Sequence, residues 1–314
     1  MNVKGSPQYA APPSTPQIRR MARFTLAALF GVTLLYPLIV AVASITLWYW
    51  PVASVFVVGV ALSSLWWAAE GQPPWLAVAN SRVLNAWRSY FALQVWRETP
   101  PLASESRVLF VAVPHGLFPM AVPLLSGAVF ERVFPELSRR KPRAAVASVF
   151  FWIPLLAPLV RWLGGVPATR TIIEKHLSAP GSSCLLVPDG IAGAYSSPDL
   201  TAARVEVLRI GGRTRFEELA RSLDVTIVPV YCFGHSQLWQ WSWPPHGHWL
   251  ARLSRRLRMA LIWYWPVIPA VTKGGLKVVF GPPLANDESF ATAIAQLYAR
   301  HADQDERRPL HIAH

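Results

Sequence analysis

Residues 107–120 read Arg-Val-Leu-Phe-Val-Ala-Val-Pro-His-Gly-Leu-Phe-Pro-Met. The apolar run 108–113 is typical of a central parallel strand that is buried on both faces. Pro114 ends this strand, because proline cannot donate a hydrogen bond to the ladder. His115 and Gly116 then follow the carboxyl end of the strand, where open α/β sheets bind their ligands. The stretch predicts an α/β domain organised around this turn.

His115 is the candidate reactive group, because histidine exchanges a proton near neutral pH. Gly116 leaves room beside it for a substrate. The same tripeptide recurs at residues 245–247, but there it follows a tryptophan-rich loop broken by proline and no strand. We therefore rank His246 far below His115. A solvated histidine on an ordinary turn is the simpler alternative for His115.

The composition narrows the class of protein. The chain of 314 residues is 53% hydrophobic and 15% charged, which is more apolar than an ordinary soluble domain. Its net charge of +13 favours an anionic partner, such as an acidic membrane surface or a phosphate-bearing co-substrate. The sequence has no nucleic-acid-reading motif, so no nucleic-acid partner is expected. Cys184 and Cys232 form no disulfide framework, and we interpret the single C-x-x-H of Cys232 and His235 as structural.

A long uncharged segment, residues 24–69, precedes the predicted strand. It is too long for one membrane span of about 20 residues and about right for two. The aromatic residues and the proline of 48–51 suit the tip of a helical hairpin. The flanking arginines favour the cytoplasmic side for both ends: Arg19, Arg20, Arg23, Arg82 and Arg88. A cleaved signal peptide is the alternative, which the continued apolar run disfavours.

The sequence predicts four parts of the chain, of which this uncharged segment is the second. These are a disordered, proline-rich and basic N-terminus (1–23), a membrane hairpin (24–70), an interfacial helix (71–100) and a catalytic domain (101–314). Within the last part, short apolar runs alternate with helix-like stretches, which predicts a mostly parallel sheet. The further predicted strands are 144–149, 183–187, 225–231 and 276–280.

The turn also resembles a known signature. Val113-Pro114-His115-Gly116 is similar to the H-P-H-G of the type-2 diacylglycerol acyltransferase family, which reads E-P-H-S in plant relatives. Four further blocks resemble the family's motifs in the same order: 163–170 (G-G-x-x-P-x-x-R), 186–193 (P-G-G-x-x-E), 208–234 (L-R-x-R-x-G-F…V-P-x-Y-x-F-G) and 279–284 (V-V-G-x-P-I). The likeness covers roughly residues 105–300.

The resemblance implies a glycerolipid-acyltransferase-like domain that moves an acyl group from acyl-CoA to diacylglycerol, giving triacylglycerol. It implies His115 as general base, with Gly116 and Asp189 beside it. Asp189 stands where the family has glycine, and Gly193 where it has glutamate. Either Asp189 takes the part of that glutamate, or the acceptor differs. The expected substrate-binding residues are Pro114, Arg170, Gly190, Arg209 and Arg213, an ordinary ion pair being the alternative for each arginine.

The expected partners are acyl-CoA as co-substrate, a neutral lipid acceptor and membrane lipids, with no metal and no other cofactor. The expected location is an integral membrane protein with its catalytic domain on the cytosolic face, in the endoplasmic reticulum if eukaryotic or the inner membrane if bacterial. Two alternatives stay open. One is the same transfer to a monoacylglycerol, a long-chain or phytyl alcohol or a lysophospholipid. The other is a non-catalytic membrane protein of the same fold.

Overall fold

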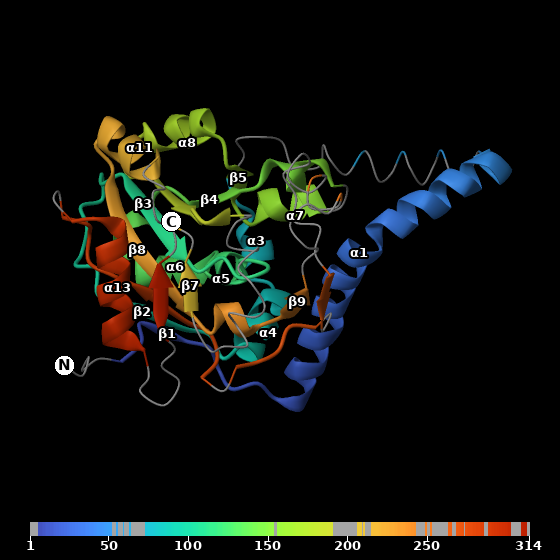
Figure 1. Ribbon diagram of the computed structural model, residues 1–314, viewed down its shortest axis with the longest axis horizontal. Helices are drawn as coiled ribbons and strands as arrows, with labels where there is room; N and C mark the ends of the chain where they lie inside the picture. Colours follow the sequence, from blue (N-terminus) through green and yellow to red (C-terminus); the bar gives the residue numbers. More distant parts are fainter. Residues whose placement is uncertain are drawn as a thin grey trace.

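The structure is a computed structural model of the chain (Figure 1). It describes residues 6–51, 55, 59, 63, 73–153, 156–190, 206–208, 210, 215–242, 249, 252, 263–265, 268–272, 274–285, 288–302 and 309–312. Arg209, Arg213, Gly193 and His246 lie outside these residues.

An eight-stranded sheet forms the centre, in the order β1-β2-β11-β8-β3-β6-β4-β5. Its strands are β1 (Tyr9–Ala10), β2 (Gln94–Arg97), β3 (Val108–Val113), β4 (Arg143–Val146), β5 (Gly165–Pro167), β6 (Ser183–Leu186), β8 (Thr226–Phe233) and β11 (Lys277–Phe280). Two small sheets pair β9 (Gln240–Ser242) with β10 (Trp263–Trp265), and β7 (Glu206–Leu208) with β12 (Leu310–Ile312).

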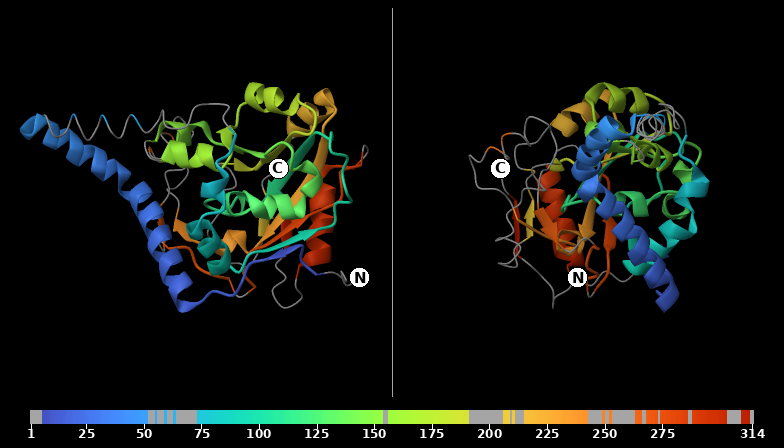
Figure 2. Two further views of the ribbon diagram at one scale, coloured as in Figure 1. Left: turned by 180° about the vertical axis from the view of Figure 1, so that it is seen from behind. Right: turned by 90° about the vertical axis from the view of Figure 1, so that its right-hand side faces the viewer.

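Helices cover both faces of the large sheet (Figures 1 and 2). The helices are α1 (Pro16–Tyr49), α3 (Leu76–Ala79), α4 (Arg82–Tyr90), α5 (Ala121–Leu124), α6 (Ala128–Val133), α7 (Leu156–Trp162), α8 (Arg170–Leu177), α11 (Arg215–Leu223) and α13 (Phe290–His301). Short 3-10 helices are η2 (Pro135–Leu137), η3 (Ser148–Trp152) and η4 (His235–Gln237).

Strand β3 is the buried central strand that the sequence predicts, and all six of its residues are buried. Because side chains alternate along a strand, its two faces serve two cores. Val108, Phe110 and Ala112 join a cluster covered by α1, α4, α5 and α6. Residues 109, 111 and 113 join a second cluster covered by α8, α11 and α13. The fold is therefore a three-layer α/β/α arrangement.

The sheet is mixed, so the prediction of a mostly parallel sheet is wrong. Strands β8, β3, β6, β4 and β5 run parallel, but β11 is antiparallel to β8 and β1 is antiparallel to β2. Lys277 at the start of β11 pairs with Phe233 at the end of β8. The segment between these two strands therefore leaves and re-enters the sheet at the same edge, which makes β11 antiparallel to β8. An apolar run reads the same in either direction. Its sequence therefore predicts the strand but not the direction.

The N-terminal segment is more ordered than predicted. Tyr9–Ala10 pairs with β2, and helix α1 begins at Pro16 rather than after the basic cluster. The Thr15 side chain accepts a hydrogen bond from the amide of Ile18 at 3.3 Å, and proline is well suited to the first turn. The Thr-Pro pair is thus a helix start, and residues 16–23 belong to α1.

Helix α1 coincides with the first arm of the predicted hairpin, and Figure 1 shows its later half extending away from the sheet. Most of the second arm lies outside the described residues, so no hairpin is seen. Within the described part of the chain, no helix has the length and apolar character needed to cross a membrane.

Residues 73–100 do not form the single helix that is predicted over 71–100, because they contain α3, α4 and β2. Ser81 caps a new helix by accepting from the amide of Leu84, and Ala92 at φ 46° ends that helix before β2 begins. Arg88, expected at a membrane flank, is 1% exposed and donates to the carbonyls of Ala79, Leu124 and Ser126. Burial lowers the pKa of its guanidinium. Arg88 therefore ties α4 to α5, the helix that follows the His115 turn.

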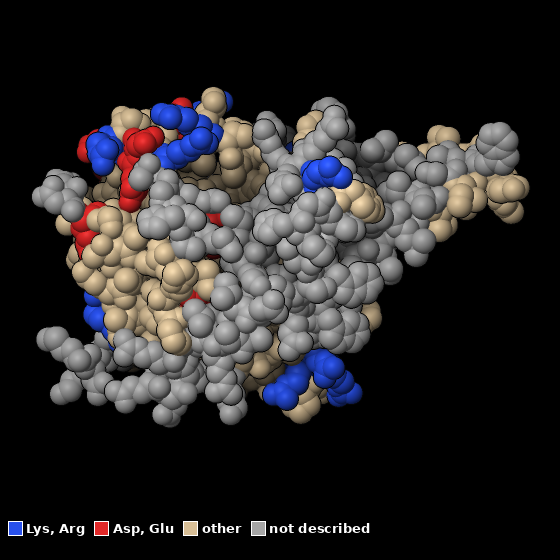
Figure 3. All heavy atoms as spheres, in the orientation of Figure 1, with Lys and Arg blue, Asp and Glu red and all other residues tan. Residues whose placement is uncertain are grey.

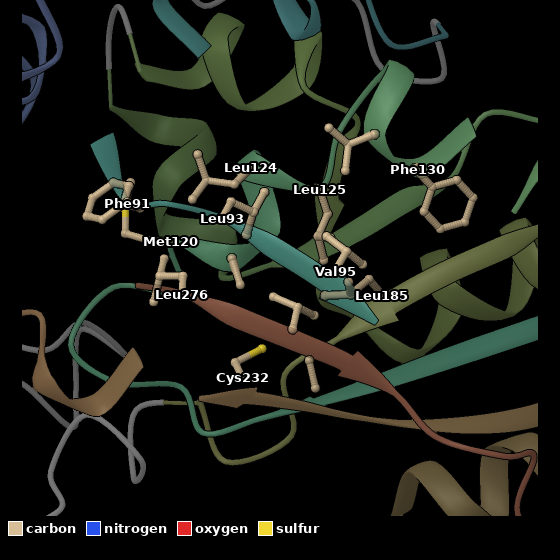
Figure 4. Close-up of a cluster of buried hydrophobic side chains, with 14 of the residues drawn as sticks. Phe91, Leu93, Val95, Met120, Leu124, Leu125, Phe130, Leu185, Cys232 and Leu276 are labelled. Carbon is tan, nitrogen blue, oxygen red and sulfur yellow. The ribbon is translucent and has the colours of Figure 1, made fainter. Parts of the chain in front are cut away.

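Hydrophobic packing fixes that same segment. Figure 4 shows Met120, Leu124 and Leu125 in one cluster with Phe91 and Leu276, from the neighbouring chain segments. All five side chains are buried. The turn after β3 is therefore held at its far end by core packing as well as by Arg88.

Candidate active site

The loop 114–121, which we call the His115 loop, begins at a cis Val113-Pro114 peptide bond and ends at the start of α5. His115 is half-buried. Its Nδ1 lies 2.8 Å from the carbonyl oxygen of Gly116. A carbonyl can only accept, so Nδ1 carries the hydrogen and the neutral ring has its lone pair on Nε2. The loop thus presents a ring nitrogen that is able to take a proton.

Asp189 lies against the backbone of this loop. It follows β6, the strand beside β3, and its Oδ2 accepts a hydrogen bond from the backbone amide of His115 at 3.0 Å. The side chain is 1% exposed. The carboxylate therefore contacts the main chain of His115, whereas the His115 ring pairs with Gly116.

Gly116 has a geometric reason to be glycine. Its φ is +60°, a left-handed conformation that side chains disfavour. A Cβ there would also lie 3.0 Å from the carbonyl oxygen of His235. No described residue accepts a hydrogen bond from the amide of Gly116. That amide is therefore a candidate donor to an oxyanion.

Gly190 follows Asp189 at φ +45°, and nothing lies within 4 Å of the place where its Cβ would be. Pro114 contributes its carbonyl oxygen, which accepts from Nδ1 of His235 at 3.0 Å. The structure thus brings Pro114, His115, Gly116, Asp189 and Gly190 to one edge of the sheet.

Arg170 shares that edge but lies farther away. It starts α8 after β5, three strands from β3 in the sheet, or about 14 Å at ~4.8 Å per strand. Its exposed side chain donates from Nε to Glu174 at 2.6 Å. Figure 3 shows lysine and arginine beside acidic residues over α8 and α11, at the top of the view. This contact is the ordinary ion pair that is the alternative for Arg170.

The cysteines offer no nucleophile. Burial raises the pKa of both thiols to about 12, and the nearby charge of Asp189 adds to the effect at Cys232. Both thiols are therefore protonated at neutral pH, and a protonated thiol is a poor nucleophile.

His235, two residues beyond the end of β8, is a site residue that sequence reasoning missed. Its ring is buried, with Nδ1 at the Pro114 carbonyl and Nε2 accepting from the amide of Ala121 at 3.3 Å. Both ring nitrogens are engaged by backbone groups. The sequence does contain a signal for His235: it follows a predicted strand (225–231), and reactive groups gather where parallel strands end.

Burial lowers the pKa of His235, the hydrogen bond to Pro114 raises it and the neighbouring His115 lowers it, so that the pKa is about 4. Above pH 6.5 the ring is neutral in the folded and unfolded chains. Between pH 6.5 and 4 the unfolded chain binds a proton that the folded chain excludes, so we expect the free energy of unfolding to fall by roughly 3 kcal/mol.

Thermal unfolding midpoints between pH 7.5 and 4 would measure this loss, and His235→Asn should make the decline smaller, leaving the part due to His176, whose pKa burial also lowers. Partial burial raises the pKa of Glu98, but hydrogen bonds from His301 and Arg300 outweigh it and hold that pKa at about 2. Glu98 therefore loses its contribution only between about pH 4.5 and 2. Equal declines in the parent and in His235→Asn would contradict the assignment to His235.

Known proteins are similar to this chain at low identity. Acyl-CoA wax alcohol acyltransferase 2 of Homo sapiens is 25% identical over 198 residues, which cover 61% of this chain and 56% of that protein. Diacylglycerol O-acyltransferase 2 of Danio rerio is 28% identical over 177 residues, covering 55% and 47%. 2-Acylglycerol O-acyltransferase 1 of Homo sapiens is 23% identical over 209 residues, covering 65% and 59%. The chain spans about half the length of these relatives.

Among solved structures, the 1-acyl-sn-glycerophosphate (LPA) acyltransferase PlsC from Thermotoga maritima aligns with 82% of this chain and 96% of its own, at a TM-score of 0.40 and 17% identity. The family model described as diacylglycerol acyltransferase matches residues 55–277, a range that contains β3, the His115 loop and Asp189. Since that range is more than half of the chain, the chain belongs to the diacylglycerol acyltransferase family.

Proposed function

We propose that this chain is a membrane-bound O-acyltransferase that moves a fatty acyl group from acyl-CoA to the free hydroxyl of diacylglycerol, giving triacylglycerol. The observation that carries the proposal is the state of the His115 ring. Its Nδ1–H is committed to the Gly116 carbonyl, which leaves the lone pair of Nε2 for a substrate hydroxyl.

The reaction follows from that lone pair. Nε2 takes the hydroxyl proton as the hydroxyl oxygen attacks the thioester carbonyl, and the C=O electrons move onto oxygen. The amide of Gly116 is placed to donate to that oxyanion, with the amide of Gly190 as a second candidate. When the C–S bond breaks, the thiolate of CoA leaves, and the proton on Nε2 returns to it. No external oxidant or metal is required by this balance.

Transfer to a long-chain alcohol is the second candidate. The relative with 25% identity over 198 residues carries the name acyl-CoA wax alcohol acyltransferase 2, and the chemistry at His115 would be the same for any primary hydroxyl. The test is a panel of acceptors given to the purified protein with labelled acyl-CoA, followed by thin-layer chromatography of the lipids. Diacylglycerol should give the highest rate. A higher rate with a long-chain alcohol would move the proposal to that acceptor.

We place the protein at a membrane because α1 exposes large apolar side chains beyond a basic start. Phe24, Tyr49 and Trp50 are each more than 70% exposed. Arg19, Arg20 and Arg23 occupy the first turns of α1, where Figure 3 shows a basic group at the lower edge. Apolar side chains that follow basic ones suit an acidic bilayer surface, and the cytosolic face is the expected side.

Arg170 is proposed to bind a phosphate of acyl-CoA in place of Glu174. Arg170→Ala should raise KM for acyl-CoA up to about 10-fold, because a charge-assisted hydrogen bond is lost from an exposed site, and should leave KM for the lipid acceptor near the parent value. Initial rates at varied acyl-CoA and salt would measure this effect, which should shrink at high salt.

The matched control is Glu174→Gln, which removes the competing partner and keeps Arg170. It should lower KM for acyl-CoA or leave it unchanged. If Arg170→Ala raised both KM values equally and also lowered the unfolding midpoint, Arg170 would be a structural ion-pair residue.

A further inference from the structure

His235 enters the site because β8 lies beside β3. The two strands run parallel, with Val113 opposite Tyr231, so the chain segments that follow them leave the sheet side by side. Gly234 at φ +80° then turns the chain into η4, whose first residue is His235. The side chain is 1% exposed. This places an imidazole ring directly against the His115 loop.

The hydrogen bonds of the ring reach both ends of that loop. Nδ1 donates to the carbonyl of Pro114, the residue before His115, and Nε2 accepts from the amide of Ala121, where α5 begins. The carbonyl can only accept and the amide can only donate, so a single neutral tautomer satisfies both. A leucine in this place would leave two buried backbone groups unpaired.

Packing ties the middle of the loop to the same segment. A Cβ on Gly116 would lie 3.3 Å from Nδ1 of His235, so the glycine backbone rests on the imidazole ring. Phe118 packs on Trp239, four residues after His235, with ring centroids 5.2 Å apart. Phe30 of α1 contacts both of these rings, with its ring centroid 4.9 Å from that of Phe118 and 5.1 Å from that of Trp239. The loop is thus held at its ends by His235 and at its centre by aromatic contacts.

We propose that His235 is a positioning residue for acyl transfer, whose imidazole clamps the two ends of the His115 loop and so orients Nε2 of His115 toward the acceptor hydroxyl. The inference rests on the proposed function for its chemical consequence. It assigns His235 no contact with substrate. The clamp itself is a property of the loop and can be measured without turnover.

Three substitutions separate the two hydrogen bonds. His235→Leu removes both. His235→Asn keeps a donor close to the position of Nδ1, for Pro114, and His235→Gln keeps an acceptor close to the position of Nε2, for Ala121. His301→Gln is the matched control, because His301 is also buried and bonds Glu98, which follows β2, three strands away from β3 in the sheet.

The first measurement is hydrogen–deuterium exchange of the full-length protein in detergent micelles, without acyl-CoA. His235→Leu should speed exchange of the peptide that contains residues 114–122 by about 10-fold, because hydrogen bonds worth ~1 kcal/mol or more each are lost there. Peptides from β6 and β4 should exchange as in the parent. His301→Gln should leave the 114–122 peptide unchanged.

The second measurement is the kinetics of acyl transfer. His235→Leu should lower kcat roughly 10²-fold with KM for acyl-CoA unchanged, because a displacement of ~1 Å in a reacting group costs about that much. His235→Asn should stay within about 10-fold of the parent, since the bond next to His115 is retained, and His235→Gln should lose more than His235→Asn. His301→Gln should lower the unfolding midpoint and keep kcat.

Unchanged exchange of the loop in His235→Leu would overturn the inference, as would faster exchange with the kcat of the parent. Equal losses in the Asn, Gln and Leu variants would also overturn it, because the specific hydrogen bonds would then not matter. If the folded parent protein transferred no acyl group, the proposed function would be refuted instead. The exchange rates of the 114–122 peptide would then test by themselves whether His235 holds the loop.

Discussion

Replacing His115 by alanine should remove most acyl transfer, lowering kcat by on the order of 10²- to 10⁴-fold, the usual contribution of a positioned general base. The loss follows from the Nε2 lone pair, which no other side chain of the loop 114–121 can replace. KM for acyl-CoA should change little, because the phosphates of CoA are proposed to bind at α8. Initial rates with labelled acyl-CoA measure both quantities.

His246→Ala is the control for this variant, since it lies in the second Pro-His-Gly of the chain and outside the described residues. It should stay within a few-fold of the parent rate. A loss in His246→Ala together with a normal rate in His115→Ala would move the active site to the loop after Trp243. Normal rates in both would exclude histidine base catalysis at either place.

Replacing Asp189 should give the second large effect. Asp189→Asn keeps an oxygen for the His115 amide but removes the charge that strengthens the bond, so it should lower kcat about 10-fold. Asp189→Ala, which leaves the amide without that acceptor, should lower kcat roughly 10²-fold, because loop displacement adds to the lost bond. KM for acyl-CoA should stay near the parent value in both variants.

Asp224→Asn is the matched control, because Asp224 is fully exposed and pairs with Arg107 at 3.5 Å, before β8 begins. It should leave kcat unchanged. The amount of folded protein and its unfolding midpoint are measured in parallel. If Asp189→Asn turned over at the parent rate, Asp189 would serve only the packing of the loop.

The parts of the fold that the sequence predicts are those encoded locally. Residues 108–113 are apolar on both faces and end at a proline, so β3 and the turn with His115 are visible without a structure. The runs at 144–149, 183–187, 225–231 and 276–280 likewise mark β4, β6, β8 and β11. The antiparallel direction of β11 is set by where its connection returns, which periodicity does not record.

The errors at 1–23 and 71–100 have a common physical cause. Long apolar and basic patterns outweighed short capping signals, although Thr15-Pro16 starts α1 and Ser81 starts α4. The charge of Arg88 predicts a place beside a membrane span. In the fold its guanidinium is buried and satisfied by carbonyls that are distant in the sequence, which only tertiary structure reveals.

The sequence predicts Asp189 as a residue of the candidate site but does not predict His235, for a similar reason. The resemblance of residues 186–193 to the family's P-G-G-x-x-E block points to Asp189, and in the structure its carboxylate accepts from the backbone amide of His115. His235 was interpreted only as half of a C-x-x-H pair, because the resemblance to the family's motif ended at Gly234. Its part in the loop depends on two backbone contacts across more than 100 residues of chain.

We propose above all that this chain moves an acyl group from a thioester to a lipid hydroxyl. The most direct measurement is a single reaction of the purified full-length protein with labelled acyl-CoA and diacylglycerol in mixed micelles, in which free CoA thiol and labelled triacylglycerol are both quantified. We expect equal amounts of the two products from the parent protein, and neither product above background with His115→Ala. Thiol release without labelled triacylglycerol, or equal rates in the parent and in His115→Ala, would contradict it.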